Sequence, residues 1–233
     1  MSDALLLVLF VTGVLNDGPA ALPYGEPCRI VEPNPHAWLA FEWQDHHLSR
    51  IERFSSDALR ERTTLYWEGN RVERMEQDLD ADGTVDFVFR LEWARQRPVR
   101  VTRSNAEGGS VTGPSPDQRW IWSDDGRTVR ITEGPQDPTR LARFDGHGRL
   151  LRLEVEAPEA RVLLVLSRGP DGRVRIEETA YNRYELRYDA RGRPVERVET
   201  AHHGYDAEGR NDPRSWLPSS PDLDRYEHGC PRP

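Results

Sequence analysis

The sequence contains no lysine. All 32 basic residues are arginines, against 40 acidic residues, and the formal net charge is −8. Arginine and glutamate are interleaved along the chain rather than clustered, so the sequence has no basic stripe of the kind that binds a phosphate backbone. This pattern predicts a solvated surface and argues against nucleic acid as a partner.

Long apolar runs are also scarce. The run at residues 4–15 has the length of a signal-peptide core and is too short to span a bilayer comfortably. We interpret residues 1–21 as a signal peptide, with a retained anchor or a buried strand as the alternatives. The expected location is therefore periplasmic, secreted or at the cell surface, with no membrane span after cleavage.

The chain has only two cysteines, Cys28 and Cys230. In an exported protein an even number of cysteines predicts a disulfide. A bond between these two would close a loop of about 200 residues and restrict the unfolded chain strongly.

Sequence motifs of catalysis are missing as well. The chain has no nucleophile elbow, no phosphate-binding loop, no His-Glu-x-x-His zinc motif and no Cys–His nucleophile arrangement. We therefore expect no catalytic residues and a non-enzymatic role.

Apolar residues alternate with polar ones through most of the chain. In the clearest stretch, Val85, Phe87, Phe89, Leu91 and Trp93 share one face. A hydrophobic share of 36% beside a charged share of 31% fits a sheet with one face in water. The period of two predicts strands rather than amphipathic helices.

Turns with aspartate and glycine separate the apolar runs. The clearest are Tyr188-Asp189-Ala190-Arg191-Gly192-Arg193, Phe144-Asp145-Gly146-His147-Gly148-Arg149 and Tyr205-Asp206-Ala207-Glu208-Gly209-Arg210. Aspartate can accept hydrogen bonds from amides two residues on, and the late glycine can adopt a positive φ. The turn glycines Gly126, Gly148, Gly172, Gly192 and Gly209 are 22, 24, 20 and 17 residues apart, which is one hairpin per repeat.

These signals predict an all-β fold. We expect a long antiparallel meander of repeated β-hairpins, with about twelve strands, forming a curved sheet or a barrel-like wrap. Residues 22–47 are expected to be a proline-rich lead-in, residues 48–210 the hairpin repeat domain, and residues 211–233 an irregular tail.

The Tyr-Asp-x-x-Gly-Arg units at 188–193 and 205–210, with the Phe version at 144–149, resemble the YD repeats of the RHS family. The resemblance is clear from about residue 123 to residue 210. It implies β-hairpin strips at the cell surface or in secreted proteins, some of which curl into shells around a toxin. This chain departs from the large members because it has few copies and no recognisable autoproteolytic core or toxin domain.

The segment from Asp78 to Asp86 predicts a cation site. Asp78, Asp80, Asp82 and Asp86, with Gly83, match positions 1, 3, 5, 9 and 6 of an EF-hand loop, and Thr84 would offer its carbonyl. Position 12 is Phe89 instead of glutamate, so calcium binding would be weak, on the order of 10⁻⁴–10⁻³ M. The alternative is a plain hairpin turn.

Four tryptophans, Trp67, Trp93, Trp120 and Trp122, form a possible ligand face, with core packing as the alternative. The leading functional hypothesis is an exported, non-enzymatic YD-repeat-like scaffold that binds a protein or glycan partner of the envelope or cell surface. The second hypothesis is an immunity protein or small-ligand carrier that uses the concave side of the sheet.

Overall fold

The structure of the protein is a computed structural model that describes residues 7–9, 26–32, 36–108, 117–133, 137–156, 161–179, 181–205, 211–218 and 223–228. These residues form seventeen strands: β1 (Arg29–Val31), β2 (Ala37–Gln44), β3 (His47–Ser55), β4 (Ala58–Glu68), β5 (Arg71–Asp78), β6 (Phe87–Ala94), β7 (Arg97–Asn105), β8 (Asp117–Trp122), β9 (Thr128–Thr132), β10 (Thr139–Phe144), β11 (Leu150–Glu156), β12 (Arg161–Arg168), β13 (Val174–Thr179), β14 (Asn182–Tyr188), β15 (Pro194–Tyr205), β16 (Asn211–Pro218) and β17 (Leu223–Glu227).

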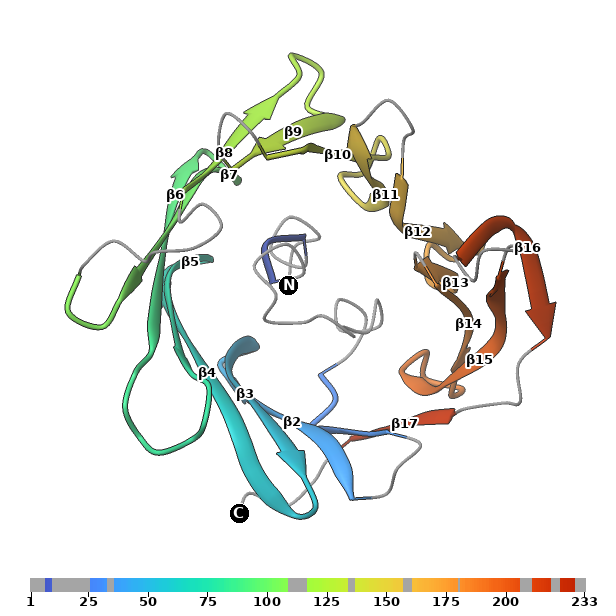
Figure 1. Cartoon of the computed structure of the whole chain (residues 1–233), viewed down its shortest axis with the longest axis horizontal. Coiled ribbons are helices and arrows are strands. Elements are labelled where there is room, and N and C mark those ends of the chain that lie inside the picture. Colours follow the sequence, from blue (N-terminus) through green and yellow to red (C-terminus); the bar gives the residue numbers. More distant parts are fainter. Residues whose placement is uncertain are drawn as a thin grey trace.

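The strands form a single antiparallel sheet that closes into a barrel (Figure 1). From β2 to β15 each strand pairs with its neighbours in sequence, and β17 and β1 complete the ring between β15 and β2. β16 branches from the carboxyl-terminal half of β15, so sixteen of the seventeen strands make the ring. The predicted all-β meander is confirmed, and of its two predicted forms the structure has the closed one.

The seam of the ring joins the two ends of the chain. β1 pairs with β17 in the register Arg29↔Glu227, Ile30↔Tyr226 and Val31↔Arg225. The sheet therefore extends beyond the predicted repeat domain: β1 and β2 lie in the predicted lead-in, and β16 and β17 lie in the tail predicted to be irregular. Sequence patterns could not show the β1–β17 pairing, because the two strands lie near opposite ends of the chain and no hairpin turn joins them.

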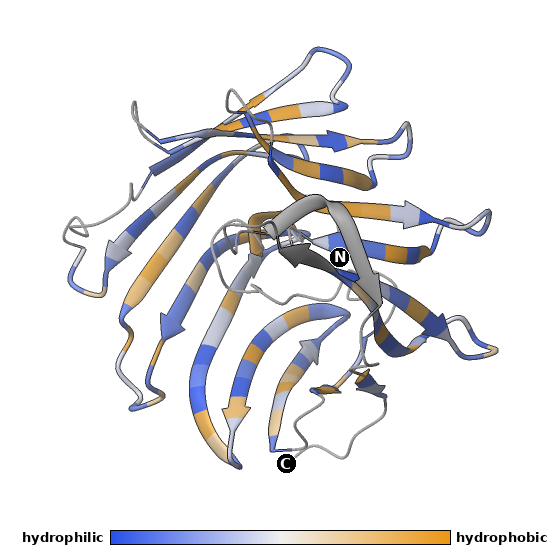
Figure 2. Cartoon of the chain, turned by 45° about the vertical axis from the view of Figure 1, so that its right-hand side comes forward, coloured by the Kyte–Doolittle hydropathy of each residue, from blue (hydrophilic) through white to orange (hydrophobic). Residues whose placement is uncertain are grey.

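Apolar and polar residues alternate along the strands (Figure 2). The buried apolar residues form one cluster on the inner wall, to which nearly every strand of the ring contributes. Burying one face of a strand fixes its register, because a slip of one residue would turn the apolar set outward. The hydrophobic core of this protein is thus the interior of the barrel.

A repeated irregularity shapes the hairpins. The strand register shifts at an aromatic residue just before the turn in six hairpins, at Trp43, Phe54, Trp67, Trp93, Phe144 and Tyr188. Such bulges increase the local twist and help a sheet to curl. The hairpin repeat therefore begins well before residue 123, where the YD-like turns become recognisable in the sequence.

Candidate functional site

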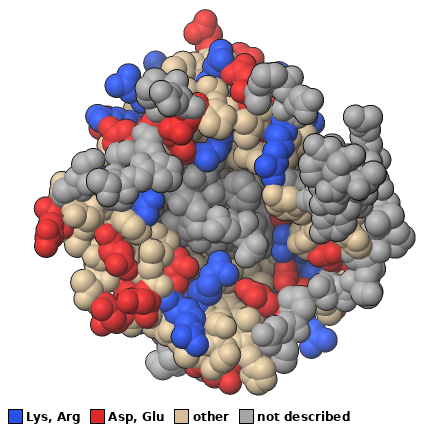
Figure 3. Space-filling view, in the orientation of Figure 1, with Lys and Arg blue, Asp and Glu red and all other residues tan. Residues whose placement is uncertain are grey.

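The outer wall is charged. Arginine and glutamate on neighbouring strands form ion pairs on this face, for example Arg50–Glu42 at 2.9 Å, Arg62–Glu52 at 2.8 Å and Arg187–Glu196 at 2.9 Å. Arginine and acidic side chains are interspersed over the view in Figure 3. Opposite charges across a strand pair stabilise the sheet modestly and keep its outward face in water.

The lumen is apolar. Leu7, Val8 and Leu9, the described residues of the predicted signal peptide, lie in the middle of the ring with no exposed surface (Figure 1). They belong to the same apolar cluster as the inner wall. The barrel thus encloses an apolar peptide segment, while cleavage after residue 21 stays a prediction.

Polar residues interrupt the inner wall in places: Thr63 and Gln77 lie opposite each other there, and Gln118 lies opposite the buried Val101. A buried ion-pair cluster on another part of this wall forms the candidate site. The Arg197 guanidinium lies between two carboxylates, 2.9 Å from Glu177 and 2.7 Å from Asp224. It also stacks on the Tyr184 ring at 3.6 Å. Glu177 and Arg197 are only 2% and 5% exposed, so this charged group is buried within the apolar interior.

Strand register explains why these side chains point inward. Glu177 on β13 lies opposite Leu166 of β12, a buried inner-wall residue, and Arg197 on β15 lies opposite the buried Leu186 of β14. Residues directly opposite each other in an antiparallel pair share a face. β17 then brings Asp224 opposite Arg197 across the seam of the ring.

Two polar atoms at this place, the Arg197 Nε and the Tyr226 hydroxyl, have no hydrogen-bond partner in the part of the chain that the structure describes. Burial raises the pKa of Tyr226 well above its ordinary value. Burial alone would lower the pKa of Arg197, but the charge of Glu177, followed by Tyr226 and Asp224, raises it instead. Arg197 therefore stays charged, and the cluster can donate hydrogen bonds inside an apolar lumen.

Sequence reasoning missed this cluster. Glu177 and Arg197 have the same charge alternation around them as the outward-facing residues, and Asp224 lies in the segment predicted to be irregular. Alternation alone gives no signal, because a period of two from the inward-facing Val174 would turn Ile176 inward; a register shift at the start of β13 brings Glu177 to the inner wall instead. The pairing register of distant strands, rather than a local sequence motif, brings the residues of this site together.

The predicted tryptophan face lies within the packing of the barrel. Trp120 is buried, and Trp67, Trp93 and Trp122 pack against the core at the hairpin ends. The indole N–H groups of these three donate to the carbonyls of Leu48, Val72 and Pro98 at 2.7–2.8 Å. This arrangement accounts for the tryptophans by packing, and a ligand role for them stays a prediction.

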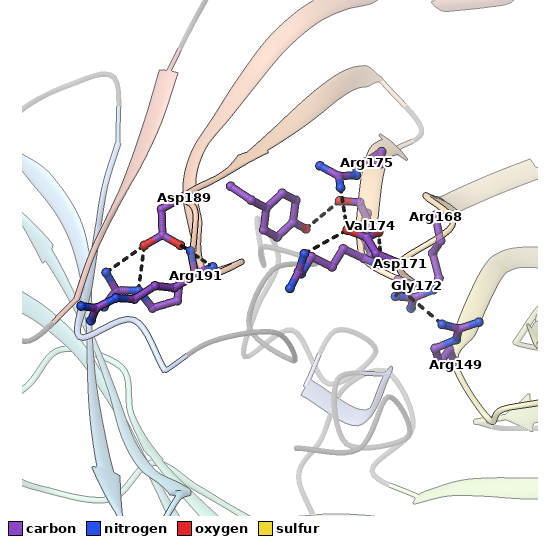
Figure 4. Close-up of polar contacts among 11 residues, drawn as sticks. Arg149, Arg168, Asp171, Gly172, Val174, Arg175, Asp189 and Arg191 are labelled. Carbon is purple, nitrogen blue, oxygen red and sulfur yellow. Dashed lines mark hydrogen bonds and ion pairs between the residues drawn. The ribbon is translucent and has the colours of Figure 1, made fainter.

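The aspartate–glycine turns have the predicted chemistry. Asp189 Oδ1 accepts hydrogen bonds from the amides of Arg191 at 2.9 Å and Arg193 at 2.8 Å, and its Oδ2 pairs with the Arg193 side chain (Figure 4). Asp145 repeats this with His147 and Arg149. The hydrogen bond from the Arg193 amide holds the pKa of Asp189 below its ordinary value, and the Arg193 side chain adds a smaller effect in the same direction.

Arginines also link successive turns. A Cβ on Gly192 would lie 1.9 Å from Nη2 of Arg173, and one on Gly172 would lie 2.1 Å from Nη1 of Arg149. Arg149 and Arg168 both direct Nη1 at the Gly172 carbonyl (Figure 4). The guanidinium of one turn thus occupies the space that the next glycine leaves open.

We expect Gly192→Ala to destabilise the protein more than Gly148→Ala. The two glycines have similar φ values of +78° and +74°, but nothing lies within 4 Å of a Cβ on Gly148. Each substitution should cost about 1 kcal/mol for the backbone conformation. Gly192→Ala should cost about 1 kcal/mol more because it displaces Arg173. Urea denaturation measures both losses in the free energy of unfolding. Equal losses for the two variants would show that the position of Arg173 contributes nothing to stability.

The structure brings part of the predicted cation loop together. Carboxylate oxygens of Asp78, Asp80 and Asp86 lie within 4.8 Å of one another, between β5 and β6. Asp82 is outside this group, and its Oδ1 accepts a hydrogen bond from the Thr84 amide at 2.6 Å. Asp78, Asp80 and Asp86 are therefore the residues positioned to hold a metal ion.

Cys28 lies beside the seam, next to β17. Its amide donates to the Glu227 carbonyl at 2.9 Å, and its Sγ lies 3.3 Å from the same oxygen. The predicted partner, Cys230, is three residues beyond Glu227 in the sequence and lies outside the described residues. The pairing of the two cysteines therefore stays a prediction.

Within the part of the chain that the structure describes, no helix has the length and apolar character needed to cross a membrane. No family model matches the chain, and no curated protein matches it.

Several solved structures are similar at low identity. A TcdB2-TccC3 structure without its hypervariable C-terminal region shares 14% identity over 73% of this chain and 10% of its own, with a TM-score of 0.31. A TcdB2-TccC3-TEV structure shares 15% identity over 76% of this chain and 10% of its own, with the same TM-score of 0.31. A porin-like protein from Bacteroides uniformis shares 10% identity over 88% of this chain and 97% of its own, with a TM-score of 0.37. The chain spans about a tenth of the first two proteins, and TM-scores this low establish neither a family nor a function.

Proposed function

We propose that this chain is an exported, non-enzymatic binding protein that encloses an apolar guest in the lumen of its barrel. The observation that carries the proposal is the complete burial of Leu7, Val8 and Leu9 in one apolar cluster with residues of the inner wall. An enclosed apolar wall that buries one apolar segment offers the same transfer free energy to another, about 25 cal/mol per Å².

The two faces of the barrel support an aqueous location. Membrane-spanning barrels face lipid with apolar side chains and keep polar ones inside. Here the order is reversed, with ion pairs such as Arg62–Glu52 outside and the apolar cluster inside. We place the protein in the periplasm, in the extracellular medium or at the cell surface, where the predicted signal peptide and disulfide also place it.

The buried polar cluster supports a guest with one polar group. Glu177, Asp224 and Arg197 together carry one negative charge, which disfavours an anion in the lumen. Within this cluster, the Arg197 Nε and the Tyr226 hydroxyl have no hydrogen-bond partner among the described residues. A neutral hydrogen-bond acceptor, such as an ester or ketone oxygen on an otherwise apolar molecule, suits them.

The test is organic extraction of the purified protein followed by mass spectrometry. The chain from residue 22 onward, produced by export, is expected to carry an apolar compound in near-stoichiometric amount. The chain with residues 1–21 retained should carry less, because its own segment occupies the lumen. Extracts of both forms without any enriched apolar compound would contradict the proposed function.

A further inference from the structure

We infer that the loop between β5 and β6 binds one calcium ion through Asp78, Asp80 and Asp86, and that Asp82 is not a ligand. The loop lies between two strands at the barrel rim opposite the aspartate–glycine turns, since successive connections of a meander alternate between rims. The site is independent of the lumen and of the proposed guest.

Each of the three carboxylates uses one oxygen to hold the loop. Asp78 Oδ2 accepts from the Gly83 amide at 3.0 Å, and Asp80 Oδ1 accepts from the Asp82 amide at 3.3 Å. Asp86 Oδ2 accepts from the Leu79 amide at 2.7 Å. Among the described residues, no hydrogen bond or ion pair engages the second oxygen of these carboxylates, and one carboxylate oxygen from each residue lies within 4.8 Å of the other two.

Asp78 provides the observation that points to a cation. Its side chain is only 6% exposed, and its buried Oδ1 has no hydrogen-bond partner within the described ranges. A buried carboxylate oxygen with neither a donor nor a counter-charge is costly. A cation held with Asp80 and Asp86 removes that cost.

The other aspartate turns of this protein show what a purely structural turn looks like. Asp189 and Asp145 each pair with an arginine four residues on, at 2.8 Å and 2.7 Å. In contrast, none of Asp78, Asp80, Asp82 and Asp86 forms an ion pair with any residue in the described ranges, in a chain with 32 arginines. A cation from solution would therefore be needed to neutralise the repulsion among the grouped carboxylates.

The donor set suits calcium. Carboxylate oxygens are hard ligands, and calcium accepts irregular oxygen coordination completed by backbone carbonyls and water, whereas magnesium demands near-ideal octahedral geometry. Three protein carboxylates without a bidentate glutamate predict weak binding, with Kd on the order of 10⁻⁴–10⁻³ M as in extracellular modules.

The experiment is calorimetric titration of the full chain with calcium chloride, together with thermal melts in EDTA and in 10 mM calcium. We expect one binding site per chain and a rise in Tm of about 2–5 °C. Asp80→Asn, at an exposed position, should weaken binding at least about tenfold and remove the Tm rise. Asp82→Asn should keep both, because an amide oxygen can still accept from Thr84.

Three results would overturn the inference. One is the absence of calcium binding by the folded wild-type chain. Another is an equal rise in Tm with sodium chloride at matched ionic strength, which would reduce the effect to screening of the carboxylates. The third is a loss of binding in Asp82→Asn as large as that in Asp80→Asn, which would place Asp82 among the ligands as in an EF-hand loop.

Discussion

Loss of the predicted Cys28–Cys230 disulfide is expected to lower the free energy of unfolding by about 5 kcal/mol, the largest effect of any change that leaves the core intact. The bond would close a loop of about 200 residues, and the entropy that a cross-link removes from the unfolded chain rises with the logarithm of loop length. Its position strengthens the expectation, because Cys28 already bonds to β17 through Glu227.

The loss of the disulfide should affect the β1–β17 seam more than the rest of the sheet. β1 is three residues long and is held by β17 and β2, and a strand so short has few hydrogen bonds of its own. Cys28→Ser with Cys230→Ser should therefore lower stability and also speed hydrogen exchange of the β1 and β17 amides ahead of the rest of the sheet. Urea denaturation and hydrogen exchange measure the two. Unchanged stability in the double variant would contradict the predicted cross-link.

Arg197→Met is expected to destabilise the protein by about 3–5 kcal/mol at neutral pH. The substitution leaves Glu177, which is 2% exposed, as a buried charge without its partner at 2.9 Å. Methionine fills much of the arginine volume, so the loss comes mainly from the unpaired carboxylate and less from a cavity. Denaturant unfolding gives the difference.

A second substitution separates these causes. Adding Glu177→Gln removes the unpaired buried charge, so the double variant should recover part of the loss at neutral pH. A loss that persisted unchanged in the double variant would indicate packing damage instead.

The outer wall offers a matched control in the same part of the sheet. Arg187 on β14 pairs with Glu196 on β15 at 2.9 Å, as Arg197 pairs with Glu177, but Arg187 is largely exposed. Arg187→Met should cost at most about 1 kcal/mol, because solvent screens the pair. Similar losses for Arg187→Met and Arg197→Met would contradict the assignment of Arg197 to the lumen.

The sequence predicts the local structure of this protein well. Alternation of apolar residues such as Phe87, Phe89 and Leu91 identifies the strands, and the spacing of aspartate and glycine identifies the turns at 145–149 and 189–193. Both signals depend on residues close together in the chain, where backbone geometry dictates residue type directly.

Long-range pairing explains what could not be predicted. The Glu177–Arg197–Asp224 cluster depends on the register of β13, β14, β15 and β17, and its ion pairs join residues 20 and 27 positions apart. Closure depends on β1 meeting β17 across nearly the whole chain. The cation loop is predicted in part. Its aspartates are evident in the sequence, but the separation of Asp82 from the other three carboxylates depends on the loop conformation.

The enclosed apolar lumen is the central claim, and binding of a fluorescent naphthylamine probe measures it most directly. The chain from residue 22 onward, with its fold verified by circular dichroism, should bind the probe saturably at about one per chain. A synthetic peptide of residues 4–15 should displace it, and the full chain should bind it more weakly. Saturable binding that the peptide reverses is the predicted result. A folded chain from residue 22 onward with no saturable binding would contradict the account.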